Sequence, residues 1–187
     1  MARKFTVARV LTFVFDVPIV AMFSFTMFYL FRSKDFLSFL ITLVFIGIIP
    51  LFAWAYLLKH PGDYKGERKV SFIIDAVSYP LALILLLVLK KRNIYTALSL
   101  SYVLNVLVLI VINKLGYKAS GHGAGIGGPA TALAFEFGGW GALSFFLLVP
   151  VGYAKVKLGD HTVGQFATGA LVSAVITYLS FALFGVL

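Results

Sequence analysis

The chain has no cysteine among its 187 residues, so disulfide bonds and thiolate metal sites are excluded. Charge is also scarce, because 12% of the residues are charged, against about 25% in a typical soluble domain. Acidic residues are the rarest charged class, with 7 against 16 Lys and Arg, and there are 3 histidines. Hydrophobic residues make up 61% of the chain. These proportions predict a polytopic membrane protein.

The net charge of +9 is better explained by loop cations than by a nucleic-acid partner. Loop cations set membrane topology and attract lipid phosphate, so membrane lipids are the expected partners and nucleic acid is not. The N-terminal Met1-Ala-Arg-Lys resembles the start of a signal peptide. The apolar run after it has the length of a full span and no small-residue cleavage site, which favours a retained first helix.

Apolar runs, separated by charged or glycine-rich breaks, predict the membrane spans. They are Val10–Phe31, Phe36–Leu58, Val70–Leu89, Ile94–Ile112, Gly123–Phe135, Trp140–Tyr153 and Val163–Leu187. All but the fifth and sixth have the roughly 20 residues needed to cross hydrocarbon. The expected fold class is all-α, a polytopic transmembrane bundle of six or seven helices, two of them short. Residues 1–187 are expected to form a single domain.

The short fifth and sixth segments allow two topologies. They form either a shallow helical hairpin that turns near Gly138, or one long helix across Gly138-Gly139. With the hairpin, loops 59–69, 113–122 and 154–162 lie on one membrane face. With a single helix, loop 154–162 lies on the opposite face, and the polar patches described next cannot meet. The chemistry of these patches therefore favours the hairpin.

The first patch, Lys118-Ala-Ser120-Gly121-His122-Gly, opens the fifth span. Backbone amides and the dipole at a helix N-terminus attract an anion, and glycine permits close approach. His122 has a side chain whose usual pKa suits proton transfer near neutral pH. Taken alone, the patch is better explained by an N-capping Ser120 followed by a histidine in the first turn.

The second patch holds Lys155, His161 and Gln165, in the stretch 155–165. If a helix covers His161 and Gln165, their spacing of four places them on one face, and Gln165 can fix the tautomer of His161. The alternative is a capped helix with an interfacial histidine and a snorkelling lysine. A third, basic patch at 59–69 offers Arg68 as a bidentate phosphate ligand, or simply orients the protein in the membrane.

Together, these motifs resemble the type-2 phosphatidic acid phosphatase superfamily, whose members include integral membrane lipid phosphatases. Its pattern is Lys, six residues, Arg-Pro; then Pro-Ser-Gly-His; then Ser-Arg, five residues, His, three residues, Asp. The resemblance covers roughly residues 59–170. Ser120-Gly121-His122 and the spacing of His161 and Gln165 match well, whereas the first motif matches poorly.

The resemblance implies a role for each matching residue. His161 would be the nucleophile that forms a phosphohistidine, His122 the general acid, and Gln165 the residue that orients His161. The phosphate-binding residues would be Arg68, Lys118, Ser120, Gly121 and Lys155. The family needs no metal and no other cofactor, so none is expected here.

The chain also departs from the family pattern. Lys155 replaces arginine, Gln165 replaces aspartate, and Ala119 replaces the proline of the second motif. In the first motif, Lys69 follows Arg68 in place of proline, and Lys59 or Lys65 would have to serve as its lysine. Slow turnover, or binding without hydrolysis, is compatible with these changes.

Two acids, Asp16 and Asp75, lie inside predicted spans, about two helical turns from the face that carries the patches. Intramembrane acids commonly have a function. The simpler expectation is that each pairs with a lysine or arginine of the patches, which lowers the cost of insertion.

The expected function is hydrolysis of a phosphate monoester or diphosphate on a lipid, with an isoprenoid chain as one option. Phosphotransfer by the same histidines, a non-catalytic lipid-phosphate-binding or scaffold protein, and a small transporter are the alternatives. We expect an integral protein of a prokaryotic plasma membrane. The positive-inside rule favours a cytoplasmic motif face, with 11 cations against 5, or 8 against 5 without the proposed phosphate ligands Arg68, Lys118 and Lys155. The 11 are Arg3, Lys4, Arg9, Lys59, Lys65, Arg68, Lys69, Lys114, Lys118, Lys155 and Lys157, and the 5 are Arg32, Lys34, Lys90, Lys91 and Arg92. The family's members, in contrast, commonly act on the outer leaflet.

Overall fold

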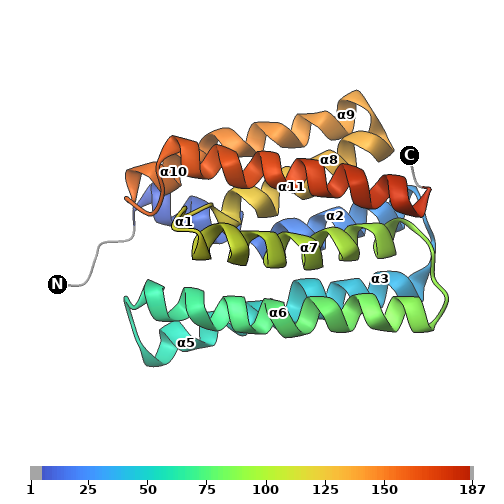
Figure 1. Ribbon diagram of the computed structural model, residues 1–187, viewed down its shortest axis with the longest axis horizontal. Helices are drawn as coiled ribbons and strands as arrows, with labels where there is room; N and C mark the ends of the chain where they lie inside the picture. The colour runs from blue at the N-terminus through green and yellow to red at the C-terminus, as the bar shows by residue number, and fades with distance from the viewer. Residues whose placement is uncertain (1–5, 186–187) are drawn as a thin grey trace.

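The computed structural model describes residues 6–185, which are helical with no strand, so the all-α prediction is confirmed. The elements in chain order are α1 (Val7–Val14), α2 (Val17–Phe31), α3 (Phe36–Thr42), the π-helical η1 (Leu43–Ile48), α4 (Ile49–Leu51), α5 (Trp54–Lys59), α6 (Tyr64–Val88), α7 (Ile94–Lys114), α8 (Gly121–Phe137), α9 (Gly139–Ala142), the 3-10 turn η2 (Leu143–Leu147), α10 (Leu148–Lys157) and α11 (Val163–Phe184). Most lie nearly parallel to one long axis (Figure 1).

Five segments of the described chain are long and apolar enough to cross a membrane. They are Phe36–Lys59, Tyr64–Val88, Ile94–Lys114, Gly139–Lys157 and Val163–Phe184. α1 and α2 would form a sixth if the pair, which bends by 44° at residues 15–16, is one span. α8 has 17 residues and is the shorter seventh member of the bundle. The polytopic membrane assignment is therefore supported.

The predicted hairpin between the fifth and sixth spans is present. Gly138 separates α8 from α9 with a φ of +58°, a backbone conformation that glycine adopts readily. The chain then runs back along the bundle through α10 (Figure 1). The hairpin is deeper than the shallow one predicted, because the second arm continues to Lys157 and reaches the length of a span.

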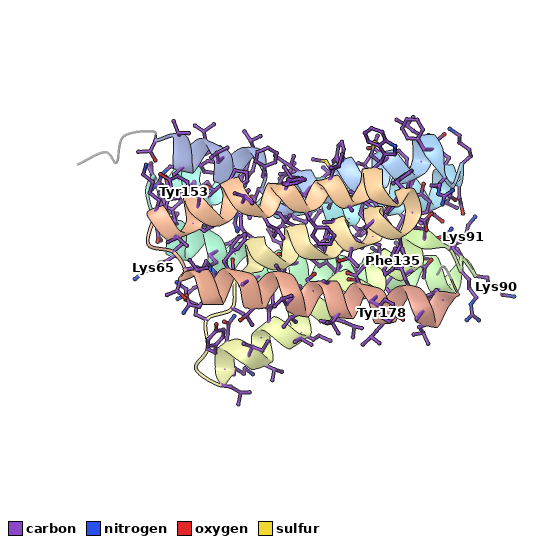
Figure 2. The ribbon with its side chains drawn as sticks, turned by 90° about the horizontal axis from the view of Figure 1, so that it is seen from above. Lys65, Lys90, Lys91, Phe135, Tyr153 and Tyr178 are labelled. Atoms are coloured by element: carbon purple, nitrogen blue, oxygen red, sulfur yellow. The ribbon has the colours of Figure 1, made fainter. Side chains whose placement is uncertain are left out.

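The hairpin brings the motif-bearing segments to one end of the bundle. The N-terminal side of α1, the α5–α6 turn, the end of α7 and the α10–α11 turn lie there together (Figure 1). Lys65 lies at this end, and Lys90 and Lys91 lie at the other (Figure 2). At the opposite end, the ion pairs Arg32–Glu136 and Lys91–Asp35, both of 2.9 Å, link neighbouring turns. Arg3 and Lys4, counted above, lie outside the described residues, as do the last two residues of the predicted seventh span.

Close packing of α8 on α11 fixes the start of both helices. A side chain at Gly123 would meet the Phe166 carbonyl of α11, and one at Gly169 would meet the Ser120 carbonyl before α8. Ser120 N also donates to the Gln165 carbonyl at 3.1 Å. The two polar patches are thus held against each other by backbone contacts that only glycine allows.

Candidate functional site

A cavity of about 540 Å³ opens at the motif end of the bundle. Its wall combines residues of α1, α2, α5, α6, α7, α8, α10 and α11 with the turn before α11. The site residues predicted from the sequence that line it are Arg68, Lys118, Gly121, His122, Lys155 and His161. His122 and His161 thus line the same cavity. Ser120 and Gln165 are not among the lining residues.

His161 lies in the turn between α10 and α11, and its side chain is 7% exposed. Its Nδ1 is buried, and no side chain of the described residues bonds to it. Nε2 is therefore the ring nitrogen left for a ligand in the cavity. Burial lowers the pKa of His161 to about 4, and three nearby cations add to the shift. These cations are Arg68, Lys118 and Lys155. The ring is consequently neutral near pH 7.

Asp160 organises the cations around His161, and its role was not foreseen from the sequence. Lys155 Nζ donates to Asp160 Oδ2 at 3.3 Å, and Lys118 Nζ donates to the Asp160 carbonyl at 2.7 Å. The Lys155 carbonyl in turn accepts from the backbone N–H groups of Asp160 and His161. The side chain of Lys155 is only 12% exposed, so its ammonium is held beside the cavity. The only hint of this role in the sequence is that Asp160 directly precedes His161.

His122 is paired with Asp16, which corrects the expected pairing of this acid with a lysine or arginine. His122 Nε2 lies 3.2 Å from Asp16 Oδ1, and Trp54 Nε1 donates to Asp16 Oδ2 at 2.9 Å. Asp16 also caps α2, because its Oδ1 accepts from Val17 N at 2.9 Å. Residues from three distant segments meet here, so no local pattern could have identified the partner. Nδ1 of His122 is the ring nitrogen that remains available to a ligand.

Ser120 caps α8 rather than lining the cavity. Its side chain is fully buried, and its Oγ accepts from Gly123 N at 3.2 Å. This is the simpler of the two interpretations of the first patch, and it corrects the expected contact between Ser120 and phosphate. Gly121 does line the cavity, at the first position of α8. The helix start therefore faces the cavity through Gly121 and His122.

Gln165 does not orient His161, so the expected contact between them is wrong. His161 precedes α11, and Thr162 is the N-cap. Gln165 Oε1 accepts from Thr162 N at 3.0 Å, while Gln165 N donates to Thr162 Oγ1 at 3.2 Å. This reciprocal capping box is encoded by Thr162-x-x-Gln165, a pattern that is visible in the sequence. The carboxamide is thus occupied by its own helix.

Arg68 lies on a helix and not in the loop predicted at 59–69. Asp63 caps α6 by accepting from Gly66 N at 2.9 Å, so the helix begins at Tyr64 and not at Val70. The bond to Gly66 and a further one from Tyr56 Oη also lower the pKa of Asp63. Arg68 forms no ion pair with a carboxylate of the described residues. Its guanidinium is therefore available to the cavity that it lines.

Asp75 does not form the expected ion pair with a lysine or arginine of the patches. Its Oδ2 accepts from Ser71 Oγ at 3.4 Å, and no cation of the described residues pairs with it.

In total, five cations and five carboxylates line the cavity. They are Arg9, Lys65, Arg68, Lys118 and Lys155, and Asp16, Asp63, Glu67, Asp75 and Asp160. The cations around His161 form the part suited to an anion.

This arrangement places a neutral imidazole next to cations, and a second imidazole held by a carboxylate, in one cavity. Such a set can bind a phosphoryl group, attack it, and protonate a leaving oxygen. No family model, no curated protein and no solved structure matches the chain.

Proposed function

We propose that the protein is a membrane lipid phosphatase that hydrolyses a phosphate monoester or diphosphate of a lipid through a phosphohistidine intermediate. The observation that carries the proposal is the shared cavity of His122 and His161, with Arg68, Lys118 and Lys155 on its wall. The helical membrane bundle and the motif resemblance agree with a lipid substrate. A prokaryotic plasma membrane is the proposed location.

In the first step, His161 Nε2 attacks phosphorus with its lone pair, and the bond between phosphorus and the leaving oxygen breaks. His122 gives the leaving oxygen a proton from Nδ1, while Asp16 stabilises the protonated ring from the Nε2 side. In the second step, water attacks the phosphohistidine and gives a proton back to His122. Phosphate leaves, and His161 is neutral again. Arg68, Lys118 and Lys155 balance the charge on the phosphoryl oxygens throughout.

Two features of His161 support its role as nucleophile. Its low pKa leaves the lone pair unprotonated at neutral pH, and its backbone N–H is anchored on the Lys155 carbonyl at 3.4 Å. A neutral imidazole is the reactive form in nucleophilic attack. Arg68 and Lys155 reach the cavity from α6 and α10, so the phosphoryl group would be held from two sides.

The test is phosphate release by the purified full-length chain from a panel of lipid monophosphates and diphosphates. We expect vanadate-sensitive release that persists in a chelator, and loss of at least about a thousandfold in His161→Ala. His60→Ala is the matched control, because His60 is exposed at the same end of the bundle and does not line the cavity. Equal loss in both variants, or no release from any substrate, would contradict the proposal.

A non-catalytic lipid-phosphate-binding protein is the second candidate, and one observation favours it. Among the described residues, no carboxylate or carboxamide side chain bonds to His161 Nδ1, so a phosphohistidine would form without that support. Acid-labile ³²P labelling of the wild-type chain by a labelled substrate separates the two candidates. Labelling that is absent in His161→Ala indicates catalysis, whereas vanadate binding without labelling indicates a binding protein.

A further inference from the structure

The cavity continues inward from the histidines along α6 and α7. On α6, Asp75 and Tyr79 line it beyond Arg68, at roughly 10 and 16 Å along the helix axis. On α7, which runs in the opposite direction, Tyr102 and Asn105 line it well inside the bundle. The rings of Tyr79 and Tyr102 meet edge to face with centroids 5.2 Å apart. These four residues are called the inner group.

Each member of the inner group has a buried oxygen that forms no hydrogen bond of good geometry in the described part of the chain, although the side chains of Asp75 and Tyr79, one helical turn apart on α6, lie close enough to interact. The atoms are Asp75 Oδ1, Tyr79 Oη, Tyr102 Oη and Asn105 Oδ1. Tyr79, Tyr102 and Asn105 are 2%, 5% and 8% exposed, so their side chains are almost wholly removed from solvent. An unsatisfied buried polar group costs about 1–3 kcal/mol, and four in one place are hard to explain by packing alone.

The neighbouring polar side chains are already occupied. Asn105 Nδ2 donates to the Ser101 carbonyl at 2.8 Å, which turns its Oδ1 away from that bond. Ser101 Oγ is engaged with Thr177 Oγ1 at 2.6 Å. Asp75 accepts the hydrogen bond from Ser71 Oγ through Oδ2, and not through Oδ1. The inner group therefore presents two acceptors, on Asp75 and Asn105, and two phenols that both donate and accept.

Hydroxyl groups are the chemical complement of this set. A hydroxyl can donate to Asp75 or Asn105 and accept from a phenol at the same time. A cation would meet the oxygens but would bring no acceptor for the phenol hydrogens. A purely apolar group would leave all four oxygens unpaired.

We propose that the inner group binds hydroxyl groups that the substrate carries beside its phosphoryl group. This inference deepens the proposed function, on which it rests, because it assigns a hydroxylated alcohol portion to the lipid phosphate. It narrows the substrate class away from bare isoprenoid phosphates, which carry no hydroxyl. The phosphoryl group lies at the outer histidines, and the hydroxylated portion points toward Tyr79 and Tyr102.

The test compares two lipid phosphates of equal chain length, a monoacylglycerol phosphate with a free hydroxyl on carbon 2 and its 2-deoxy analogue. For the wild-type chain, we expect kcat/KM to be at least about tenfold higher for the hydroxylated lipid. In Tyr79→Phe/Tyr102→Phe, this ratio should fall clearly below the wild-type value, because Asp75 and Asn105 remain as acceptors but the phenol donors are gone, and each single variant should give an intermediate ratio. Equal rates in the wild type, or a ratio that survives the double substitution, would overturn the proposal.

Tyr178→Phe is the matched control, because Tyr178 is half exposed on the outer side of α11 and contacts Phe135 through its ring. It should keep the wild-type ratio. The same pair of lipids as non-hydrolysable phosphonates, measured by calorimetry, separates this inference from the proposed function. If no phosphate is released but the hydroxylated phosphonate binds about tenfold more tightly, the enzyme proposal fails and the inner group stands. Equal binding of the two phosphonates overturns the inner group.

Discussion

At the scale of single residues, the ion pair between Asp16 and His122 is the contact that most changes how the site is interpreted. Its carboxylate joins His122 to Trp54 at the bend between α1 and α2. The family pattern places its carboxylate on the other histidine, at the position that Gln165 fills here. In the proposed mechanism, the acid would therefore support the proton donor His122 rather than the nucleophile His161. Asp16 is a positioning residue, because it acts through His122.

Substitution Asp16→Asn tests this role. The amide keeps the size of the side chain but cannot stabilise a protonated His122, so we expect kcat to fall about tenfold or more with a smaller change in KM. The alkaline limb of the pH profile, which reports loss of the His122 proton, should move to lower pH. Asp35→Asn is the control, since Asp35 is also ion-paired but lies at the opposite end of the bundle. A purely structural role for Asp16 would leave the pH profile in place.

His161 gives a prediction for acid pH. Its pKa of about 4 lies below the usual 6.5, so the attacking nitrogen stays unprotonated until the pH falls toward 4. The acidic limb of the kcat/KM profile should therefore have its midpoint near pH 4. In Lys155→Met, one positive charge beside the ring is removed, and the midpoint should rise but stay well below 6.5, because burial, the main cause of the low pKa, remains. A wild-type midpoint near 6.5 would show that the ring is not held in the cavity as described.

At the scale of elements, helix starts decide where the functional side chains lie. Arg68 is on α6 because Asp63 caps that helix, and Gln165 turns back on its own helix because Thr162 begins a capping box. Both capping patterns can be found in the sequence, so these two positions were predictable. The partner of Asp16 was not, because α1, α5 and α8 meet only in the folded bundle. The hairpin at Gly138 was predictable, since Gly138-Gly139 interrupts an apolar stretch and only a turn there brings both histidines to one end.

The contact between α8 and α11 gives the prediction at this scale. In Gly169→Ala, the new methyl group meets the Ser120 carbonyl, so α11 must move away from the start of α8. Overpacking of this kind costs about 1–3 kcal/mol, and we expect a lower Tm together with reduced activity, because His122 follows Ser120 by two residues. Gly164→Ala in the same helix is the control, since its nearest neighbour is Tyr117 Oη at 3.6 Å. The control should retain or slightly raise Tm, because alanine favours helix. Similar losses in both variants would argue against the packing explanation.

At the scale of the whole molecule, the two ends of the bundle differ in their cations. Exposed cations at the motif end, outside the proposed phosphate ligands, are Lys59, Lys65, Lys69, Lys114 and Lys157. Those at the opposite end are Arg32, Lys34, Lys90 and Arg92. Arg9, counted with the motif face in the sequence, is buried and lies 4.0 Å over the Tyr64 ring, so it belongs to the cavity wall. The motif end therefore still has more exposed cations than the opposite end, but the difference is smaller than the sequence count suggested.

The remaining difference predicts that the cavity opens to the cytoplasm. The chain has no cysteine, so single reporter cysteines can be introduced without background. His60→Cys marks the motif end, and Ser33→Cys, between α2 and α3, marks the other. In intact cells, an impermeant maleimide should label position 33, and position 60 should react only after permeabilisation. Labelling at 60 but not at 33 would place the cavity outside, on the side where the resembling phosphatases commonly act, and its lipid substrate would then have to come from the outer leaflet.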